Sequence, residues 1–152
     1  MPVTRIPVRG YHEDRFGHVN NARYLEFLEE ARWGQFAERG LDASFFKEHS
    51  IFPVVVRQTI TYRRPASAGD VLVIETQVKE AGRRKVVIAQ NARFEGSDDV
   101  SVEAEITVVF LDEKTGRPIP LDGAILDAWP ELKALRTAPD DQGTSAPRDT
   151  GI

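Results

Sequence analysis

A short polar stretch near the start of the chain contains the side chains best suited to chemistry. Asp14 supplies a carboxylate, His18 an imidazole, and Asn20 and Asn21 supply two amides. A helical pattern of apolar residues begins directly after them, so these side chains are expected where a helix begins. The first turn of a helix has unpaired backbone N–H groups and partial positive charge, which polarise carbonyls and stabilise anions. This combination predicts a site for chemistry at a carbonyl group.

Each of these residues also has a purely structural interpretation. Asp14 could attack an acyl group or activate water, but Asp in a loop commonly stabilises a turn. His18 could position the reacting carbonyl or water, or it could be a packed, hydrogen-bonded histidine. Asn20 is expected to cap the helix, because its side-chain oxygen can accept from a backbone N–H of the first turn. Asn21 is expected to act through its own backbone N–H.

A metal site is the rival interpretation. His12, Asp14 and the distant His49 have the residue types of a two-histidine, one-carboxylate iron site. Such sites usually occur in larger double-sheet scaffolds, whereas this chain places a long helix near its start. We therefore expect no metal in the site.

Composition indicates one globular domain. The chain has 152 residues, of which 41% are hydrophobic and 29% charged, and its formal net charge of −4 gives no electrostatic support to a nucleic-acid partner. The absence of cysteine excludes disulfides and thiolate nucleophiles. No apolar run approaches the roughly 20 residues that a membrane span needs, and the start of the chain lacks the apolar region of a signal peptide. The expected location is therefore cytoplasmic, with no membrane partner.

One strand, one long helix and four further strands are predicted from the periodicity. The helix spans residues 21–38, with Tyr24 and Phe27 on its wide apolar face and Gly40 after its end. Its charged residues are expected mostly on the other side: Glu26, Glu29, Glu30 and Arg32. The other expected elements are a strand at 2–10, a helical turn or packed loop at 42–50, strands at 53–64, 71–80, 85–95 and 100–111, and a short helix at 123–136. Residues 137–152 lack periodic apolar positions and are predicted to be disordered.

These elements predict a sheet covered by a helix. Tight turns join the four later strands, so the strands should form an antiparallel sheet with the one helix on its apolar face. A single five-stranded sheet leaves open edges, which predicts pairing with a second copy of the chain.

Two motifs in this arrangement resemble the hotdog fold and, more narrowly, the 4-hydroxybenzoyl-CoA thioesterase family. The first is Asp-Arg-Phe-Gly-His-Val-Asn-Asn-Ala-Arg-Tyr at residues 14–24, which continues into Phe-Leu-Glu-Glu-Ala-Arg at 27–32. The second is Tyr-Arg-Arg-Pro-Ala at 62–66, followed by Gly-Asp at 69–70. The resemblance extends over residues 3–112. It implies an α+β hotdog domain at 1–136, with a five-stranded antiparallel sheet wrapped around one long helix.

The resemblance also implies an activity. Members of this family hydrolyse an acyl-CoA to a free carboxylic acid and CoA, and need no cofactor because CoA is part of the substrate. Their catalytic carboxylate corresponds to Asp14, and the backbone N–H that polarises the thioester carbonyl corresponds to Asn21. Many members have a second acid two residues before the catalytic one. Here His12 occupies that position, and an imidazolium there could keep Asp14 ionised.

Two alternatives remain open from the sequence, an acyl-carrier-protein thioesterase and a non-catalytic acyl-thioester binder. In either case the family resemblance implies sites at a dimer interface, where residues near 54–61 of the partner could reach the acyl chain. The expected assembly is a homodimer at minimum, and a homotetramer where two dimers associate.

Substrate-binding roles are expected for residues outside the catalytic set. Asn20 shapes the start of the helix, and Tyr24 either packs in the core or lines an acyl pocket. The basic clusters either lie at solvated strand ends or bind the phosphates of CoA, for which the bidentate geometry of Arg is suited. The basic residues concerned are Arg63, Arg64, Arg84 and Lys85.

Overall fold

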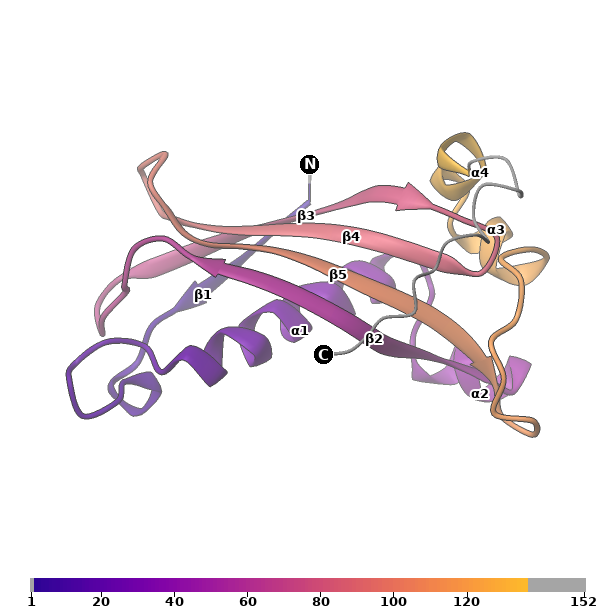
Figure 1. Ribbon diagram of the computed structural model, residues 1–152, viewed down its shortest axis with the longest axis horizontal. Coiled ribbons are helices and arrows are strands. Elements are labelled where there is room, and N and C mark those ends of the chain that lie inside the picture. Colours follow the sequence, from indigo (N-terminus) through magenta and orange to yellow (C-terminus); the bar gives the residue numbers. More distant parts are fainter. Residues whose placement is uncertain (1, 137–152) are drawn as a thin grey trace.

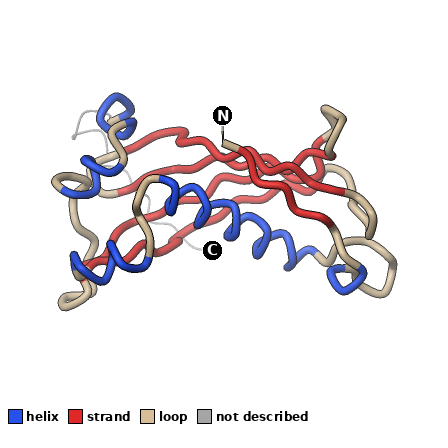
Figure 2. Tube along the Cα trace, turned by 180° about the vertical axis from the view of Figure 1, so that it is seen from behind, coloured by secondary structure: helices blue, strands red, loops and turns tan. Residues whose placement is uncertain are grey.

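The architecture is a single antiparallel sheet with a long helix across one face (Figures 1 and 2). The structure is a computed structural model and describes residues 2–136 of the chain. The strands are β1 (Val3–Pro7), β2 (Ile51–Tyr62), β3 (Val71–Ala81), β4 (Lys85–Phe94) and β5 (Val100–Asp112), in the spatial order β1-β3-β4-β5-β2. The helices are the 3-10 turn η1 (Gly10–His12) and α1 (Asn21–Glu38), α2 (Ala43–His49), α3 (Ala124–Ala128) and α4 (Glu131–Leu135). The expected α+β hotdog fold, with five antiparallel strands and one long helix, is confirmed.

Helix α1 begins and ends where the sequence predicts. The side-chain oxygen of Asn20 accepts from the N–H of Ala22 at 2.9 Å, which confirms the expected N-cap. Gly40 follows the C-terminal end with φ of +79°, a conformation that glycine adopts without steric cost. Tyr24 and Phe27 are buried against the sheet, together with Leu28, Ala31 and Phe36.

The placement of Arg32 on the outer side of the helix was wrong. Its side chain is only 6% exposed and lies between α1 and the sheet. Helical geometry accounts for this, because Arg32 lies four residues after Leu28 and four before Phe36 and so shares their buried face. The three glutamates at 26, 29 and 30 are exposed as expected.

Strand order is the second correction. The expected tight connection between the strands at 53–64 and 71–80 is not a hairpin, because β2 pairs with β5 and β3 lies between β1 and β4. Residues 63–70 instead cross the end of the sheet. They bind the segment after β1, where the N–H of Val8 donates to the carbonyl oxygen of Asp70 at 2.9 Å, and the start of β5, where Arg63 N–H donates to Ser101 at 2.8 Å. As a result, β2 is the last strand at one edge of the sheet and pairs with a neighbouring strand, β5, on one side only.

The C-terminal part of the described chain forms two short helices where one was expected at 123–136. Pro130 separates α3 from α4, and Trp129 before it adopts φ −135° and ψ 67°, outside the helical region. A residue that precedes proline is disfavoured in the helical conformation by a clash with the proline ring. The predicted disorder of residues 137–152 concerns a segment outside the described residues. Between residues 2 and 136, no helix combines the length and apolar character needed to span a membrane.

Candidate active site

The loop that carries Asp14 is a compact turn closed by its own backbone. The N–H of Asp14 donates to the carbonyl oxygen of His18 at 2.8 Å, and the N–H of Gly17 donates back to the carbonyl oxygen of Asp14 at 3.1 Å. Gly17 has φ of +82°, so the turn needs a residue without a side chain there. The Asp14 carboxylate is partly buried in this loop.

The two carboxylate oxygens of Asp14 have different environments. Oδ1 accepts from the N–H of Phe16 at 2.8 Å and, at 3.5 Å, from the N–H of His18. Oδ2 accepts no hydrogen bond from any of the residues 2–136 that the structure describes. Oδ1 therefore stabilises the turn, as expected for an Asp in a loop, and the catalytic role of Asp14 stays a prediction.

The loop is fastened on two sides. The N–H of Asn20 donates to the carbonyl oxygen of His12 at 2.9 Å, which joins the loop to η1 at the start of α1. On the other side, the N–H of Val19 donates to the carbonyl oxygen of Ala66 at 2.8 Å, and the hydroxyl of Ser67 donates to Gly17 at 2.8 Å. The crossing segment 63–70 thus holds the loop in place, which explains how the motif at 62–70 contributes to the site.

The start of α1 leaves a donor free next to this loop. Asn21 is exposed, and its backbone N–H has no acceptor among the described residues, as expected for the first residue of a helix. The Tyr62 hydroxyl donates to the carbonyl oxygen of Asn21 at 3.2 Å, so an edge residue of β2 lies over the helix start. The Asn21 N–H can therefore polarise a carbonyl oxygen.

His12 does not act as the imidazolium that the sequence suggested. Its Nδ1 accepts from the N–H of Arg9 at 2.9 Å, which requires an unprotonated nitrogen. Burial and the neighbouring positive charge of Arg23 lower the pKa of His12, and its ring packs edge-on against Phe27. A neutral His12 supports the loop by packing. The hypothesis that its positive charge keeps Asp14 ionised is wrong.

His18 and Tyr24 lie in contrasting environments. The His18 side chain is exposed and makes no hydrogen bond to the part of the chain that the structure describes, so it can reach a substrate or a water molecule. Tyr24 is 3% exposed, and its hydroxyl lies 2.8 Å from the Oγ of Ser101. Because Ser101 donates to the carbonyl oxygen of Arg64, Tyr24 donates to Ser101, and burial raises the pKa of Tyr24. The core interpretation of Tyr24 matches its position.

The four basic residues separate into two groups. Arg63 donates to Glu103 at 2.6 Å, and Arg64 forms an ion pair with Asp99 while stacking on the ring of Phe94. Both guanidinium groups are thus already engaged by carboxylates. Arg84 is exposed in the turn between β3 and β4, and Lys85 is exposed at the first residue of β4. This turn lies at the end of the sheet opposite to the Asp14 loop (Figure 1). Within one chain, the structure does not bring them together with Asp14.

A cavity beside the helix begins one turn after the free N–H. It has a volume of about 410 Å³ and lies between α1 and β2. Leu25 and Trp33 line it from the helix, and Pro53, Val54 and Val55 line it from the strand. The chain covers these two helix residues only in part, since Leu25 is 39% exposed and Trp33 is 42% exposed. Leu25 and Trp33 are large apolar residues about two helical turns apart, so they lie on the same side of α1. This spacing was the signal in the sequence that could have identified the lining.

The metal interpretation fails on geometry. His49 lies in α2, at the far end of α1 from Asp14, and its Nδ1 is bonded to the carbonyl oxygen of Phe45 (Figure 1). Within residues 2–136, no group of three or more His, Asp or Glu side chains is arranged to hold a metal ion.

Comparison with known proteins agrees with the fold and gives the class of protein. A family model described as "Thioesterase-like superfamily" matches residues 8–129. The chain is 43% identical to the long-chain acyl-CoA thioesterase FadM of Escherichia coli over 129 residues, which cover 85% of this chain and 97% of that protein. It is 29% identical to the acyl-CoA thioester hydrolase YbgC of Escherichia coli O6:H1, over 80% of this chain and 92% of that protein. The crystal structure of YbaW, a probable thioesterase from Escherichia coli, superposes with a TM-score of 0.76 at 39% identity, covering 87% of this chain and 98% of that one.

The protein is therefore a thioester hydrolase with the hotdog fold. The chain belongs to the thioesterase-like superfamily, which confirms the resemblance to hotdog acyl-CoA thioesterases seen in the motifs at 14–24 and 62–70.

Proposed function

We propose that the protein hydrolyses acyl-CoA thioesters at the start of α1, with Asp14 as the catalytic carboxylate. One observation carries this proposal: a carboxylate with one unbonded oxygen is held in a loop that leads directly to a helix start with a free N–H at Asn21. Water and the thioester give a free carboxylic acid and the thiol of CoA. The names of the relatives FadM and YbgC indicate the same substrate class.

In this proposal the Asn21 N–H binds the carbonyl oxygen as negative charge develops on it. One such donor contributes about 2.7–4 kcal/mol to the barrier. The Oδ2 atom of Asp14 either attacks the carbonyl carbon or removes a proton from the water that attacks. In the first case the C–S bond breaks, CoA leaves as the thiolate, and water then hydrolyses the acyl-aspartate anhydride to the free acid and Asp14. His18 is proposed to position the carbonyl or this water, since its side chain is exposed next to the loop.

The two roles of Asp14 are separated by a single turnover in oxygen-18 water with enzyme in excess. Attack by the carboxylate gives an acyl-aspartate anhydride, and water that adds to its aspartyl carbonyl leaves oxygen-18 in Asp14, detectable in the peptide by mass spectrometry; label in Asp14 therefore identifies the nucleophilic role. General-base catalysis places oxygen-18 only in the released acid.

The acyl group is proposed to occupy the 410 Å³ cavity between α1 and β2. Its lining by Leu25, Trp33 and Val54 suits an aliphatic or aromatic acyl group, and its start near Asn21 lets the carbonyl reach the free N–H. The purified full-length chain should release CoA thiol from a panel of aromatic, short, medium and long acyl-CoAs. Binding of these esters without release would identify a non-catalytic binder. Faster turnover of matched carrier-protein thioesters would identify a carrier-protein thioesterase.

A second copy of the chain is proposed to cover this cavity. Strand β2 has β5 on one side and an open edge on the other, and it exposes Val55 at 38% and Val56 at 56%. Open apolar edges pair readily with another strand, which supports a homodimer through β2, and two dimers would give the homotetramer. Val56→Lys places a charge at this edge and should convert the dimer to monomer in light scattering. An unchanged mass would contradict the β2 interface.

Such a dimer would also explain the basic turn at Arg84 and Lys85. Antiparallel pairing of two β2 strands reverses the second copy end for end. Its β3–β4 turn would then lie at the same end of the double sheet as the Asp14 loop of the first copy. We propose that Arg84 and Lys85 bind CoA phosphates across the dimer. Arg63 and Arg64 are less suited to this role, because each would first have to break its ion pair, with Glu103 and Asp99 respectively.

A further inference from the structure

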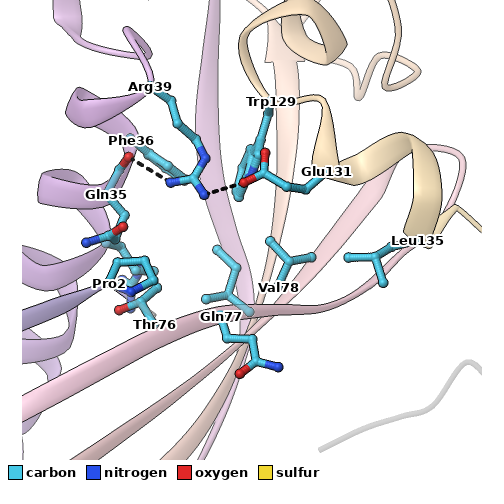
Figure 3. A pocket seen from close by; sticks show the side chains of 12 residues that line it. Pro2, Gln35, Phe36, Arg39, Thr76, Gln77, Val78, Trp129, Glu131 and Leu135 are labelled. Atoms are coloured by element: carbon cyan, nitrogen blue, oxygen red, sulfur yellow. Dashed lines mark hydrogen bonds and ion pairs between the residues drawn. The ribbon is translucent and has the colours of Figure 1, made fainter.

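A second cavity lies on the other side of α1, away from β2. It has a volume of about 430 Å³ and is lined by α1, β3 and the segment that contains α4 (Figure 3). Phe36, Val78 and Trp129 provide apolar surface, and both Trp129 and Leu135 come from the C-terminal segment. This volume is within the range of small-molecule sites in proteins, about 300–1,000 Å³. None of the proposed catalytic residues lines it.

A buried positive charge borders this cavity. Arg32 is only 6% exposed, and its guanidinium donates to the neutral Oε1 of Gln90 at 3.0 Å. The Gln90 amide donates to the carbonyl oxygen of Leu28 and to the hydroxyl of Thr76, which fixes Oε1 toward Arg32. Among the ion pairs of residues 2–136, none includes Arg32. A buried charge without a counter-ion is costly, so an anion in the cavity would be stabilised.

The other charges around the cavity cancel. Arg39 reaches from α1 to Glu131 at the start of α4, with 2.7 Å between nitrogen and oxygen (Figure 3). Among the charged side chains that line the cavity, this pair leaves Arg32 without a counter-ion; the exposed Glu29 on the same helix attracts it without forming an ion pair. A ligand with one negative charge therefore matches the site better than a neutral or a doubly charged one.

Three further polar atoms at the cavity lack partners. Gln35 Oε1, Arg39 Nε and Trp129 Nε1 are buried without a hydrogen bond to any described residue, and all three side chains line this cavity. Buried polar groups are normally hydrogen-bonded, so unpaired ones indicate a bound molecule or water. Two of the three are N–H donors, which again favours an acceptor such as a carboxylate.

We propose that this cavity binds an amphiphilic monocarboxylic acid, with the carboxylate against Arg32 and the apolar body against Phe36, Val78 and Trp129. The guanidinium fork suits a carboxylate, and the mainly hydrocarbon lining suits an alkyl or aryl body. Such an acid has the chemistry of the product of thioester hydrolysis, but any acid of this kind meets the same requirements. The site is separate from the acyl cavity, although Arg32 and Phe36 border both.

The two tryptophans of the chain make the sites separately observable. Trp129 lines the proposed acid site and Trp33 lines the acyl cavity. Full-length Trp33→Phe protein therefore reports on Trp129 alone, and Trp129→Phe protein reports on Trp33 alone. Octanoate is the probe, and octan-1-ol is its neutral counterpart of equal chain length.

In the Trp33→Phe protein, octanoate should change the Trp129 emission along a saturable curve, and octan-1-ol should bind at least about tenfold more weakly. Val78→Phe fills the cavity and should weaken octanoate binding by at least about tenfold. Val55→Phe, the same substitution in the acyl cavity, should leave it unchanged. Arg32→Met should remove the preference for the acid over the alcohol.

Equal affinities for octanoate and octan-1-ol, or an affinity that falls with Val55→Phe and not with Val78→Phe, would overturn the proposal. Circular dichroism checks the fold of each variant. If Arg32→Met does not fold, the Val78→Phe and Val55→Phe pair decides the result. Binding is measured without turnover, so the outcome does not depend on whether the protein hydrolyses acyl-CoA.

Discussion

The substitution Asp14→Asn separates the chemical role of this side chain from its structural role. Oδ1 of Asp14 accepts from the Phe16 N–H at 2.8 Å, and an asparagine oxygen can accept the same bond. A hydrogen bond to a charged acceptor contributes about 1.5–3 kcal/mol and a neutral one about 0.5–1.5 kcal/mol. The free energy of unfolding should therefore fall by about 1 kcal/mol. The loop should keep its shape.

The effect on turnover should be much larger. Asparagine replaces the unbonded Oδ2 with an NH₂ group, which can neither attack a carbonyl nor accept a proton. We expect kcat to fall at least about a hundredfold, the lower end of what a positioned acid–base group provides. Steady-state release of CoA thiol from a good acyl-CoA substrate gives kcat, and thermal unfolding gives the stability.

Two further variants complete the test. Asp98→Asn makes the same change in the exposed turn before β5 and should leave both kcat and stability unchanged. Asp14→Ala also removes the acceptor for the exposed Phe16 N–H and should lower the free energy of unfolding by a further ~1 kcal/mol, the net contribution of a neutral hydrogen bond. A folded Asp14→Asn protein with kcat within about tenfold of the original, a barrier change of about 1.4 kcal/mol, would refute the role of Asp14.

Three other predictions follow from the site. Asn20→Ala removes the cap of α1 and should lower the free energy of unfolding by about 1 kcal/mol, measured by urea denaturation; an unchanged midpoint would contradict the cap. Alanine at both Arg84 and Lys85 should raise KM about fivefold with little change in kcat, as expected for exposed charges worth about 1 kcal/mol, whereas Lys114→Ala should change neither. His12 has a lowered pKa when folded, so its contribution to stability is complete above its unfolded pKa of about 6.5 and is lost as pH falls through that value toward the folded one. His12→Gln should reduce the slope of stability against pH below this point, and equal slopes for the two proteins would contradict the lowered pKa.

Much of the fold follows from local sequence. The helix at 21–38 is determined by its cap at Asn20, its apolar spacing and the glycine after its end, and each of these acts within a few residues. The five strands follow from alternation and turn residues in the same way. The turn at Asp14 is mainly local too, because the bonds that close it join residues 12 to 20, although Ala66 and Ser67 also hold it from outside. The sequence alone was therefore sufficient to identify the loop, the helix start and the class of protein.

Strand order depended on contacts between distant segments. Turn residues at 65–70 are compatible with both a hairpin and a crossing, and the crossing is selected by contacts with distant segments, such as the bonds to Val8 and Ser101 and the pairing of β2 with β5. That choice leaves β2 at the edge and opens the cavity beside α1. It also places Arg84 and Lys85 at the far end of the sheet from Asp14. This separation in space cannot be read from the spacing of the motifs along the sequence.

Protonation and burial were likewise decided by tertiary structure. Whether His12 is charged depends on the Arg9 N–H and the Phe27 ring that surround it. Arg32 is buried because the helix turns its side chain toward Gln90 on β4, a strand far away in the sequence. Chain-local patterns determine which elements form and where they begin. Packing between elements determines which charged side chains are buried away from water. These buried charges in turn determine which ligands a cavity can bind.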